Sequence, residues 1–407
     1  MGSPADHLPL PFSDETILSL LTSLSLPPPT SIKPLKVTAA FHLIYVITYP
    51  TTTIIPKLPP SAPTPPGPST DLILRISGDH IAKIKTENEA AVLSWVRENT
   101  SIPVPDLVSY DAMTDNPLGR EYILFTRCPG QSLADVFRSF SDEQMDSIIE
   151  QVIDILLQLH KKEWTQIGGL QFSPPNQTQN NTEKIIPGPV LEETFWFLPD
   201  IEKHWPATET FSTLNISGPF NTYIDYITAH IRKYMHAISI HPTLEHMRDT
   251  LPKLEAFLTA LPASASTLNK TPLRLAHKDL HYANILVDPS TAKITAILDW
   301  EFAGVVPFPR WNPTRAFLWN AQQDDEEDSL VEKADMFARF EERCGERGVD
   351  AQGLLADMQY TSKEQEQMQI VANFLRAIVE VCPRGERGDA VKGWRESMLG
   401  AMKTFGV

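Results

Sequence analysis

Three side chains in two short stretches of this sequence, Asp279, Asn284 and Asp299, have the types and the spacing to carry out one kind of chemistry. A carboxylate such as Asp279 can accept the proton of a hydroxyl group, and the oxygens of Asn284 and Asp299 can hold a divalent cation. A base and two oxygen ligands are what phosphoryl transfer from a magnesium nucleotide requires. We therefore expect these three residues to lie close together.

Local structure predicted from the sequence would bring the two stretches to one place. Residues 283–288 and 293–300 are apolar runs of the kind that form buried strands. Residues 289–292, with the sequence Pro-Ser-Thr-Ala, favour a turn between them. The two runs are therefore expected to pair as an antiparallel hairpin.

The register that we predict for this hairpin places both oxygen ligands at its open end. With Asp288 near Thr295, Asn284 falls opposite Asp299. Asp279 precedes Asn284 by five residues, in the loop that leads into the first strand. All three side chains would then share one end of the hairpin.

Taken one at a time, these residues have ordinary structural explanations, because an Asp or Asn at the mouth of a hairpin is most often a turn or capping residue. Their joint pattern is more specific. His277, Asp279 and Asn284 stand in the order His-x-Asp-Leu-x-x-x-Asn, and Asp299 follows two apolar residues and precedes an aromatic one. This combination is typical of the catalytic loop and metal-binding segment of kinases.

Residues 277–287 and 297–301 closely resemble the aminoglycoside phosphotransferase family, and especially its fungal-type members. The resemblance implies an α+β, two-lobed protein-kinase-like fold with a small antiparallel-sheet N-lobe and a mainly helical C-lobe. It also implies ATP and Mg²⁺ as cofactors and a small-molecule hydroxyl as the acceptor. By the same resemblance, Asp279 would be the catalytic base, and Asn284 and Asp299 would be the metal ligands.

The N-terminal part of the chain offers candidates for binding the nucleotide. Arg75 lies on a predicted strand, residues 72–76, where the family places its phosphate-binding cation, and an arginine can fork onto phosphate oxygens. A helix over residues 86–99 would supply Glu89 as the partner of this cation, with Glu87 as the alternative. The same resemblance makes the segment from Thr126 to Cys128 a hinge whose backbone binds adenine.

The chain divides, on this prediction, into three regions. Residues 1–30 would form a helical extension, residues 31–130 the N-lobe, and residues 131–407 the C-lobe, with the catalytic loop and metal-binding hairpin at residues 277–301. The N-lobe would contain a proline-rich insertion at residues 50–70, which we expect to be an extended loop because proline cannot donate to a sheet.

The predicted N-lobe departs from a protein kinase in its phosphate loop. Strands are expected at residues 35–38 and 41–49, and the turn between them, residues 38–42, contains no glycine. This absence favours slow or no turnover more than it argues against nucleotide binding. His42 in this turn would either contact phosphate or serve as a packing residue.

Other residues near the catalytic loop have open roles. His277 is expected to hold the loop through backbone hydrogen bonds, as this position does in related folds. Lys278 and His281 would either touch the transferred phosphate or the acceptor, or simply support the loop. Residues 192–205, which are rich in aromatic side chains, are expected to select the acceptor or to belong to the core.

Composition sets limits on the partners. The 407 residues are 42% hydrophobic and carry a net charge of −16, which argues against nucleic acid as a partner. Three cysteines without a pairing pattern, and a start that lacks a leader or membrane span, predict a cytoplasmic protein that uses no membrane. The oligomeric state and the choice between ATP and GTP stay open.

Two rival functions remain. A nucleotide-binding but catalytically silent regulator is favoured by the glycine-free turn, whereas a protein kinase is disfavoured by Trp300-Glu301 after Asp299 and by the lack of an Ala-Pro-Glu segment. The acceptor itself is not encoded in these motifs. Sugars, amino alcohols and secondary metabolites are all compatible with them.

Overall fold

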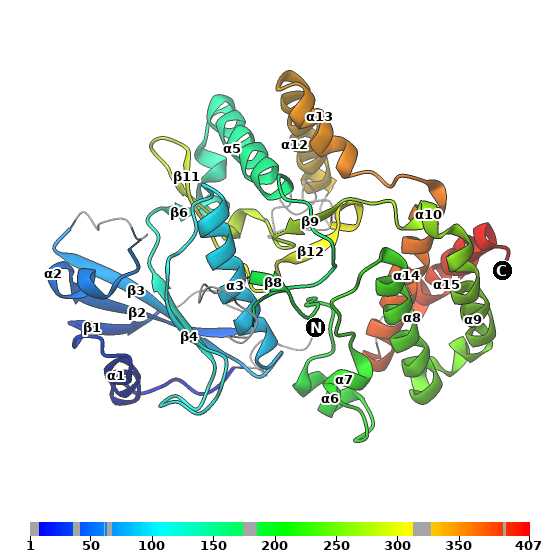
Figure 1. The fold of residues 1–407 in the computed structure, drawn as a ribbon, viewed down its shortest axis with the longest axis horizontal. Helices are drawn as coiled ribbons and strands as arrows, with labels where there is room; N and C mark the ends of the chain where they lie inside the picture. The colour runs from blue at the N-terminus through cyan, green and yellow to red at the C-terminus, as the bar shows by residue number, and fades with distance from the viewer. Residues whose placement is uncertain are drawn as a thin grey trace.

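The computed structural model describes residues 8–35, 41–60, 62, 67–173, 185–311, 327–385 and 388–407. An antiparallel sheet forms one end of the molecule and a group of helices the other, with short strands between them (Figure 1). This arrangement confirms the predicted α+β fold with a small sheet-based N-lobe and a mainly helical C-lobe. The exact lobe boundaries, at residues 30 and 130, stay a prediction.

The N-lobe is built on a five-stranded antiparallel sheet in the order β1-β2-β3-β5-β4. Its strands are β1 (Ser31–Pro34), β2 (His42–Pro50), β3 (Ser69–Ser77), β4 (Leu107–Asp111) and β5 (Tyr122–Thr126). Alternate side chains of β2 are buried, as expected for a strand with one face on a core.

Helix α1 (Asp14–Ser23) belongs to the same core, where it buries Ile17, Leu20 and Leu21 with apolar residues of the sheet. The Ser13 hydroxyl accepts a hydrogen bond from the Thr16 amide and caps the helix. The predicted N-terminal helix is therefore present, and it is joined to the N-lobe through its apolar face.

One local prediction in the N-lobe is wrong in detail, and another lies largely outside the described residues. A strand occupies Ser31–Pro34, whereas residues 36–40, which include most of the strand predicted at residues 35–38 and most of the glycine-free turn, lie outside the described part of the chain. The proline-rich insertion is not wholly an extended loop. It begins with α2 (Thr51–Ile54) and the 3-10 helix η2 (Ile55–Lys57), in which the proline lies in the first turn, where it is tolerated.

Helix α3 (Ile84–Asn99) joins the two lobes. Nearly all of its first three turns are buried. The Asn88 side-chain amide donates to the carbonyl oxygens of Glu301 and Ala303, both at 2.9 Å, and its oxygen accepts from the Leu170 amide at 2.6 Å. One side chain of α3 thus fixes two separate C-lobe segments.

The C-lobe consists of helices around short two- and three-stranded sheets. Its strands are β6 (Gln131–Ser132), β7 (Leu170–Phe172), β8 (Ile185–Pro187), β9 (Leu273–Ala276), β10 (Ile285–Asp288), β11 (Lys293–Ile297) and β12 (Gly304–Pro307). Its helices are α4 (Leu133–Val136), α5 (Asp142–His160), α6 (Leu198–His204), α7 (Phe211–Leu214), α8 (Tyr223–Ile240), α9 (Leu251–Ala260), α10 (Ala265–Leu268), α12 (Glu327–Glu346), α13 (Val349–Asp357), α14 (Lys363–Val381) and α15 (Gly388–Met402).

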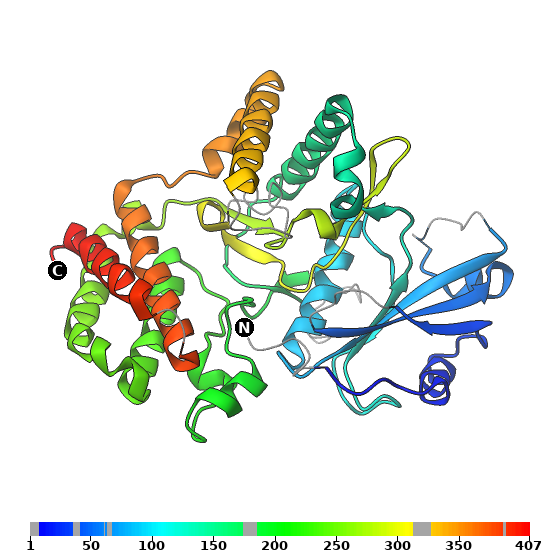
Figure 2. The same ribbon diagram turned by 180° about the vertical axis from the view of Figure 1, so that it is seen from behind.

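The helices form two groups with separate apolar cores. Helices α5, α12 and α13 stand together on one side of the β9–β12 region, and α8, α9, α14 and α15 form the end of the molecule away from the sheet (Figures 1 and 2). Among the described helices, none combines the length and the apolar composition needed to cross a bilayer.

The predicted hairpin exists, but its register differs by two residues near the turn and by one residue at the open end. Strands β10 and β11 pair with Asp288 opposite Lys293, and a bulge follows between Leu286 and Val287. The tight turn ends at Ala292, whose φ is +54°, and β11 begins at Lys293, as predicted. The Leu298 amide consequently donates to the Asn284 carbonyl oxygen at 2.8 Å, so Leu298 lies opposite Asn284 and the predicted partner, Asp299, lies one residue further on.

Candidate active site

The loop after β9 is held by one buried histidine. His277 Nε2 donates to the Leu298 carbonyl oxygen at 2.8 Å, and His277 Nδ1 accepts from the Asp279 amide at 3.3 Å. This pattern requires the neutral imidazole, and burial lowers the pKa of His277 to about 4. His277 therefore ties the loop to the segment that carries Asp299.

Asp279 and Asn284 contact each other directly. The Asn284 Nδ2 group donates to the Asp279 carbonyl oxygen at 2.9 Å and to its carboxylate Oδ2 at 3.0 Å. Both amide hydrogens are thereby used, which leaves the Asn284 Oδ1 atom as the group for a cation. The side chain of Asp279 remains 31% exposed, so its carboxylate is open to a reactant.

His281 lies on the other carboxylate oxygen of Asp279. The distance from His281 Nε2 to Asp279 Oδ1 is 3.4 Å. Burial disfavours the charged imidazole, but the hydrogen bond and the charge of Asp279 outweigh burial and raise the pKa of His281. This contact agrees with a supporting role for His281 in the loop, and a contact of His281 with the phosphate or the acceptor stays a prediction.

Asp299 has an unusual backbone conformation. Its φ is +64°, and Lys278, beside Asp279, has a φ of +71°. Left-handed backbone is costly for residues other than glycine and is found mostly where function constrains the chain. The Asp299 side chain is 36% exposed, and Arg75 Nη2 donates to its Oδ1 at 3.3 Å.

Arg75 reaches from β3 to residues of both lobes. Its Nη1 donates to Glu89 Oε1 at 2.8 Å, and its Nη2 donates to Glu301 Oε2 at 3.2 Å. The competing candidate Glu87 instead lies 3.8 Å from Lys83 at the surface. The structure thus places Glu89, rather than Glu87, against Arg75.

Two buried residues in this cluster, Lys85 and Glu301, were not identified from the sequence. Lys85 Nζ donates to Glu301 Oε2 at 2.7 Å and to His42 Nε2 at 2.7 Å. The spacing of Lys85 and Glu89 on one helical face was a signal for Lys85. The Glu301 contact was not foreseeable, because Lys85 and Glu301 are 216 residues apart.

His42 lies inside this charged cluster. Since an ammonium group can only donate, Lys85 requires an unprotonated His42 Nε2, and burial together with Arg75 and Lys85 holds the pKa of His42 well below its usual value. His42 is therefore a buried residue that accepts a hydrogen bond within this cluster, and its contact with phosphate stays a prediction.

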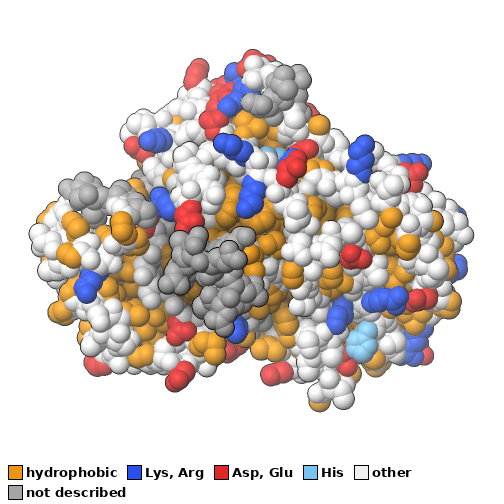
Figure 3. Space-filling model, viewed as in Figure 1, with side chains coloured by type: hydrophobic (Ala, Val, Ile, Leu, Met, Phe, Trp, Pro, Cys, Tyr) orange, Lys and Arg blue, Asp and Glu red, His pale blue; other side chains and the backbone are white. Residues whose placement is uncertain are grey.

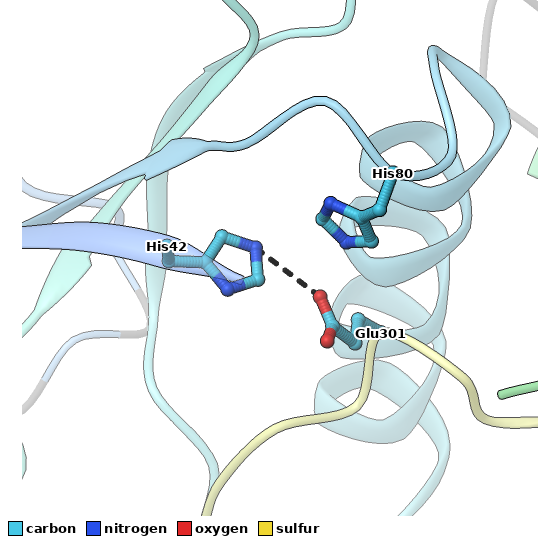
Figure 4. Close-up of side chains that lie close together, drawn as sticks. All are labelled: His42, His80 and Glu301. Carbon is cyan, nitrogen blue, oxygen red and sulfur yellow. Dashed lines mark ion pairs between the residues drawn. The ribbon is translucent and has the colours of Figure 1, made fainter. Parts of the chain in front are cut away.

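Figure 4 shows that His42, His80 and Glu301 also point toward one another. Their possible ligand atoms lie within 4.8 Å of each other, and His42 Nε2 is 3.2 Å from Glu301 Oε2. A metal ion is nevertheless unfavourable here, because Arg75 and Lys85 already neutralise the same Glu301 oxygen. The cluster is therefore an ion-pair network between the lobes.

Three rings lie next to this network and link the lobes through apolar contact. Phe41 stacks on His80 with ring centroids 4.7 Å apart. Both rings make T-shaped contacts with Phe197, whose ring centroid lies 5.6 Å from that of Phe41 and 5.7 Å from that of His80. Phe41 and His80 belong to the N-lobe, whereas Phe197 precedes α6 of the C-lobe. One of the aromatic residues of the 192–205 segment is therefore part of the lobe interface.

The hinge candidates Thr126 and Cys128 lie at the end of β5. The Thr126 amide donates to the Asp106 carbonyl oxygen at 3.0 Å, and the Arg127 amide donates to the Asp71 carbonyl oxygen at 3.1 Å. In the described part of the chain, the Cys128 amide has no such bond, so it is the amide of this segment that can face a ligand. Binding of adenine by this segment stays a prediction.

A second pair of residues that sequence reasoning missed is Glu192 and Glu193. Glu192 is fully buried, and its carboxylate accepts two hydrogen bonds from Arg310, at 2.9 and 3.0 Å. Lys278 Nζ donates to the neighbouring Leu191 carbonyl oxygen, which places this segment against the catalytic loop. This contact of Lys278 supports the loop, and a contact of Lys278 with the phosphate or the acceptor stays a prediction.

The acidic character of the site fits a divalent cation. Burial and the negative charge of Asp279 raise the pKa of Glu193 to about 8, and burial together with Glu301 raises the pKa of Asp299. Carboxylates crowded in this way are stabilised by a cation, and carboxylate and amide oxygens are the ligands that Mg²⁺ prefers. The donor set of Asn284 and Asp299 is therefore suited to magnesium.

Comparison with known proteins identifies the family. Residues 64–308, more than half of the chain, match the sequence model of the phosphotransferase enzyme family abbreviated APH. The chain belongs to this phosphotransferase family. The match confirms the resemblance first seen in the catalytic-loop residues, and its range includes the strand of Arg75 as well as the hairpin of Asn284 and Asp299.

Several fungal proteins are similar to this member of the phosphotransferase family. A subtelomeric hrmA-associated cluster protein of Aspergillus fumigatus is 24% identical over 266 residues, which cover 56% of this chain and 51% of that protein. The clavilactone A biosynthesis cluster protein Y of Ampulloclitocybe clavipes is 26% identical over 236 residues, 56% of this chain and 53% of that protein. The chain spans about half the length of the curated relatives that it matches.

Solved phosphotransferase structures are also similar to this chain. A ternary complex of APH(2")-IIa with streptomycin and ATP is 10% identical, with a TM-score of 0.49, and covers 98% of this chain and 99% of that one. A complex of APH(4)-Ia with AMP-PNP and hygromycin B is 14% identical, with a TM-score of 0.45, and covers 93% and 95%.

Proposed function

We propose that the protein transfers the γ-phosphate of ATP to a hydroxyl group of a small molecule. The observation that carries the proposal is the double hydrogen bond from Asn284 to Asp279, at the end of the hairpin that leads to Asp299. It joins the proposed base to one proposed metal ligand in a fixed geometry. Membership of a phosphotransferase family supports the same reaction.

Each residue has a defined task in this proposal. The Asp279 carboxylate orients the acceptor hydroxyl and takes its proton, and Asn284 and His277 hold Asp279 in position. Asn284 and Asp299 would bind Mg²⁺, which when bound neutralises charge on the nucleotide phosphates. Arg75, fixed by Glu89, would contribute a further positive charge on the phosphate side.

The acceptor would enter on the side of residues 191–193. Glu193 carries a largely buried carboxylate whose pKa is raised by burial and by the charge of Asp279, which supports a place for it near the point where a hydroxyl would react. The buried pair of Glu192 and Arg310 fixes the backbone next to it. We therefore propose that this segment binds and selects the acceptor.

Turnover with a pooled metabolite extract tests the proposal. Purified protein is incubated with Mg-ATP and the extract, and mass spectrometry follows the gain of a phosphoryl group in any metabolite. Asp279→Asn should abolish this gain while thermal unfolding stays near that of the wild type. Asp389→Asn, an exposed change of the same chemistry on α15, is the matched control and should keep full turnover.

One observation favours a second function, a regulator that binds nucleotide without using it. Arg75 donates to Asp299, so the proposed metal ligand already has a cationic partner inside the protein. Calorimetry measures the affinity for ATP in the wild type and in Asp279→Asn. Equal affinity in the two proteins, with no turnover of any metabolite or of ATP, would support the regulatory function and contradict the enzymatic one.

A further inference from the structure

Helix α3 stands between the sheet and the C-lobe (Figure 1), but its apolar side chains share a core with the C-lobe. Ala91, Val92, Trp95 and Val96 pack in one buried cluster with residues of α5 and of the β10–β11 hairpin. The sheet forms a separate buried cluster with α1. Burial of apolar surface is the dominant stabilising term in such contacts, so the position of α3 depends mainly on the C-lobe.

Hydrogen bonds tie α3 to the C-lobe at both of its ends. Near the start of the helix, Asn88 bonds to the backbone of two C-lobe segments. Just after its end, the Ser101 amide and hydroxyl both donate to Gln158 Oε1 of α5, at 2.7 and 2.9 Å. The Pro103 carbonyl oxygen accepts from the Ile297 amide of β11 at 2.8 Å. The helix and the residues that follow it are therefore attached to α5 and to the catalytic hairpin.

The C-lobe also packs closely against α3 along its length. A Cβ on Gly169, directly before β7, would lie 2.5 Å from Asn88 Oδ1, so the backbone reaches the helix with no room for a side chain. Further along the helix, the Trp95 ring lies 5.5 Å, centroid to centroid, from the ring of Trp164, which follows α5. Packing of this density resists a shift of α3 relative to the C-lobe.

The hydrogen bonds between α3 and the sheet involve charged groups at the N-terminal end of the helix. Glu89 accepts from Arg75 of β3 at 2.8 Å, and Glu121, directly before β5, accepts from the Lys83 amide at 2.6 Å. Charged groups can exchange such partners for water, whereas separation of an apolar core exposes its surface at a large cost. The boundary between α3 and the sheet is therefore the weaker one.

We propose that α3 belongs to the rigid body of the C-lobe, and that the lobes part along the boundary between α3 and β3. The sheet and α1 are the part that moves. On opening, Arg75 leaves Glu89, Asp299 and Glu301, whereas Lys85 stays with Glu301. The ion pair of Arg75 and Glu89 is then a contact of the closed form alone. This movement is independent of any phosphotransfer activity.

Native-state hydrogen exchange of the full-length protein in increasing urea, followed by mass spectrometry of its peptides, tests the proposal. Each element exchanges with the opening free energy of the cooperative unit to which it belongs. We expect peptides of α3 to show the opening free energy and urea dependence of α5, and to differ from peptides of β2 and β3. If α3 follows β2 and β3, or if all these elements exchange as a single unit, the proposal is wrong.

Two matched cavity variants make the assignment specific. Leu74→Ala removes a buried side chain from the sheet core, and Leu156→Ala removes a buried side chain of α5 from the C-lobe core. Leu74→Ala should accelerate exchange in β2 and β3 by about thirtyfold or more and leave α3 unchanged. Leu156→Ala should accelerate exchange in α5 and α3 by a similar factor and leave β2 and β3 unchanged.

Acceleration of α3 by Leu74→Ala, or its absence in Leu156→Ala, would overturn the proposal. The wild-type comparison of α3 with α5 and with β2 and β3 needs neither variant, so it decides the question even if one of them does not fold.

Discussion

A single protonation state of His277 connects the two stretches that carry the candidate chemistry. Its two ring nitrogens bond to Leu298 and to the Asp279 amide, and only the neutral ring can donate at one nitrogen and accept at the other. The sequence predicted that His277 holds the loop. It did not predict Lys85 or Glu301 as buried partners of the site, because contacts between residues so far apart leave no spacing pattern.

The buried His277 should make stability depend on pH in a defined window. Its pKa is about 4 in the folded protein, against 6.5 when unfolded, so between these values the unfolded chain takes up a proton that the folded chain does not. Stability contributed by this group is therefore full above pH 6.5 and decreases by about 3 kcal/mol as the pH falls to 4.

Urea unfolding of the wild type and His277→Gln at several pH values measures this effect. The difference in free energy of unfolding between the two proteins should change between pH 4 and pH 6.5 and stay constant above pH 6.5. A constant difference throughout would show that the imidazole is not buried in the neutral form.

Gly130, between β5 and β6, shows how a secondary-structure connection constrains the site. Its φ is +116°, and a Cβ there would lie 2.4 Å from Thr295 Oγ1 and 2.8 Å from the Val287 carbonyl oxygen. The chain leaving the N-lobe therefore passes against the β10–β11 hairpin with no room for a side chain. This close approach fixes the proposed hinge relative to the proposed metal ligands.

Gly130→Ala should reduce the free energy of unfolding by about 3 kcal/mol, from strain at positive φ together with the clash. Gly119→Ala is the matched control. Gly119 has a φ of +62° and nothing within 4 Å of its Cβ position, so it should lose only about 1 kcal/mol. Equal losses in the two variants would contradict the close contact with the hairpin.

The hairpin also shows how far the sequence determines an element. Its existence, its two strands and the positions of Asn284 and Asp299 at one end followed from apolar runs and a turn signal. Its register did not, because the left-handed Ala292 and the bulge after Leu286 each shift the pairing, and neither residue type requires that conformation. In the proline-rich insertion, likewise, composition did not reveal the short helix α2.

The two lobes are joined by buried charge. Glu301, next to the catalytic hairpin, accepts from Arg75 of β3 and from Lys85 of α3, and all three side chains are less than 10% exposed. On the face shown in Figure 3, by contrast, the described basic and acidic side chains are scattered and form no continuous patch. The charges that join the lobes are therefore the buried ones around Glu301.

Glu301→Gln should destabilise the whole protein by about 3–5 kcal/mol, because it leaves Arg75 and Lys85 buried with too little negative charge. The matched control is Glu255→Gln, which removes an exposed partner of Arg232 and should cost less than about 1 kcal/mol. Chemical denaturation compares the two. If Glu301→Gln loses no more free energy of unfolding than the control, the buried charges around Glu301 do not hold the lobes together.

The contact of Phe41 and His80 with Phe197 has a kinetic consequence. Any movement that parts the lobes has to separate these rings and expose them to water, so opening has an activation barrier at this point. Molecules that need the lobes apart would enter and leave at a rate set by this barrier, whatever their affinity. Replacing Phe197 with a smaller side chain would shorten the residence time of such a molecule without altering a single group that touches it.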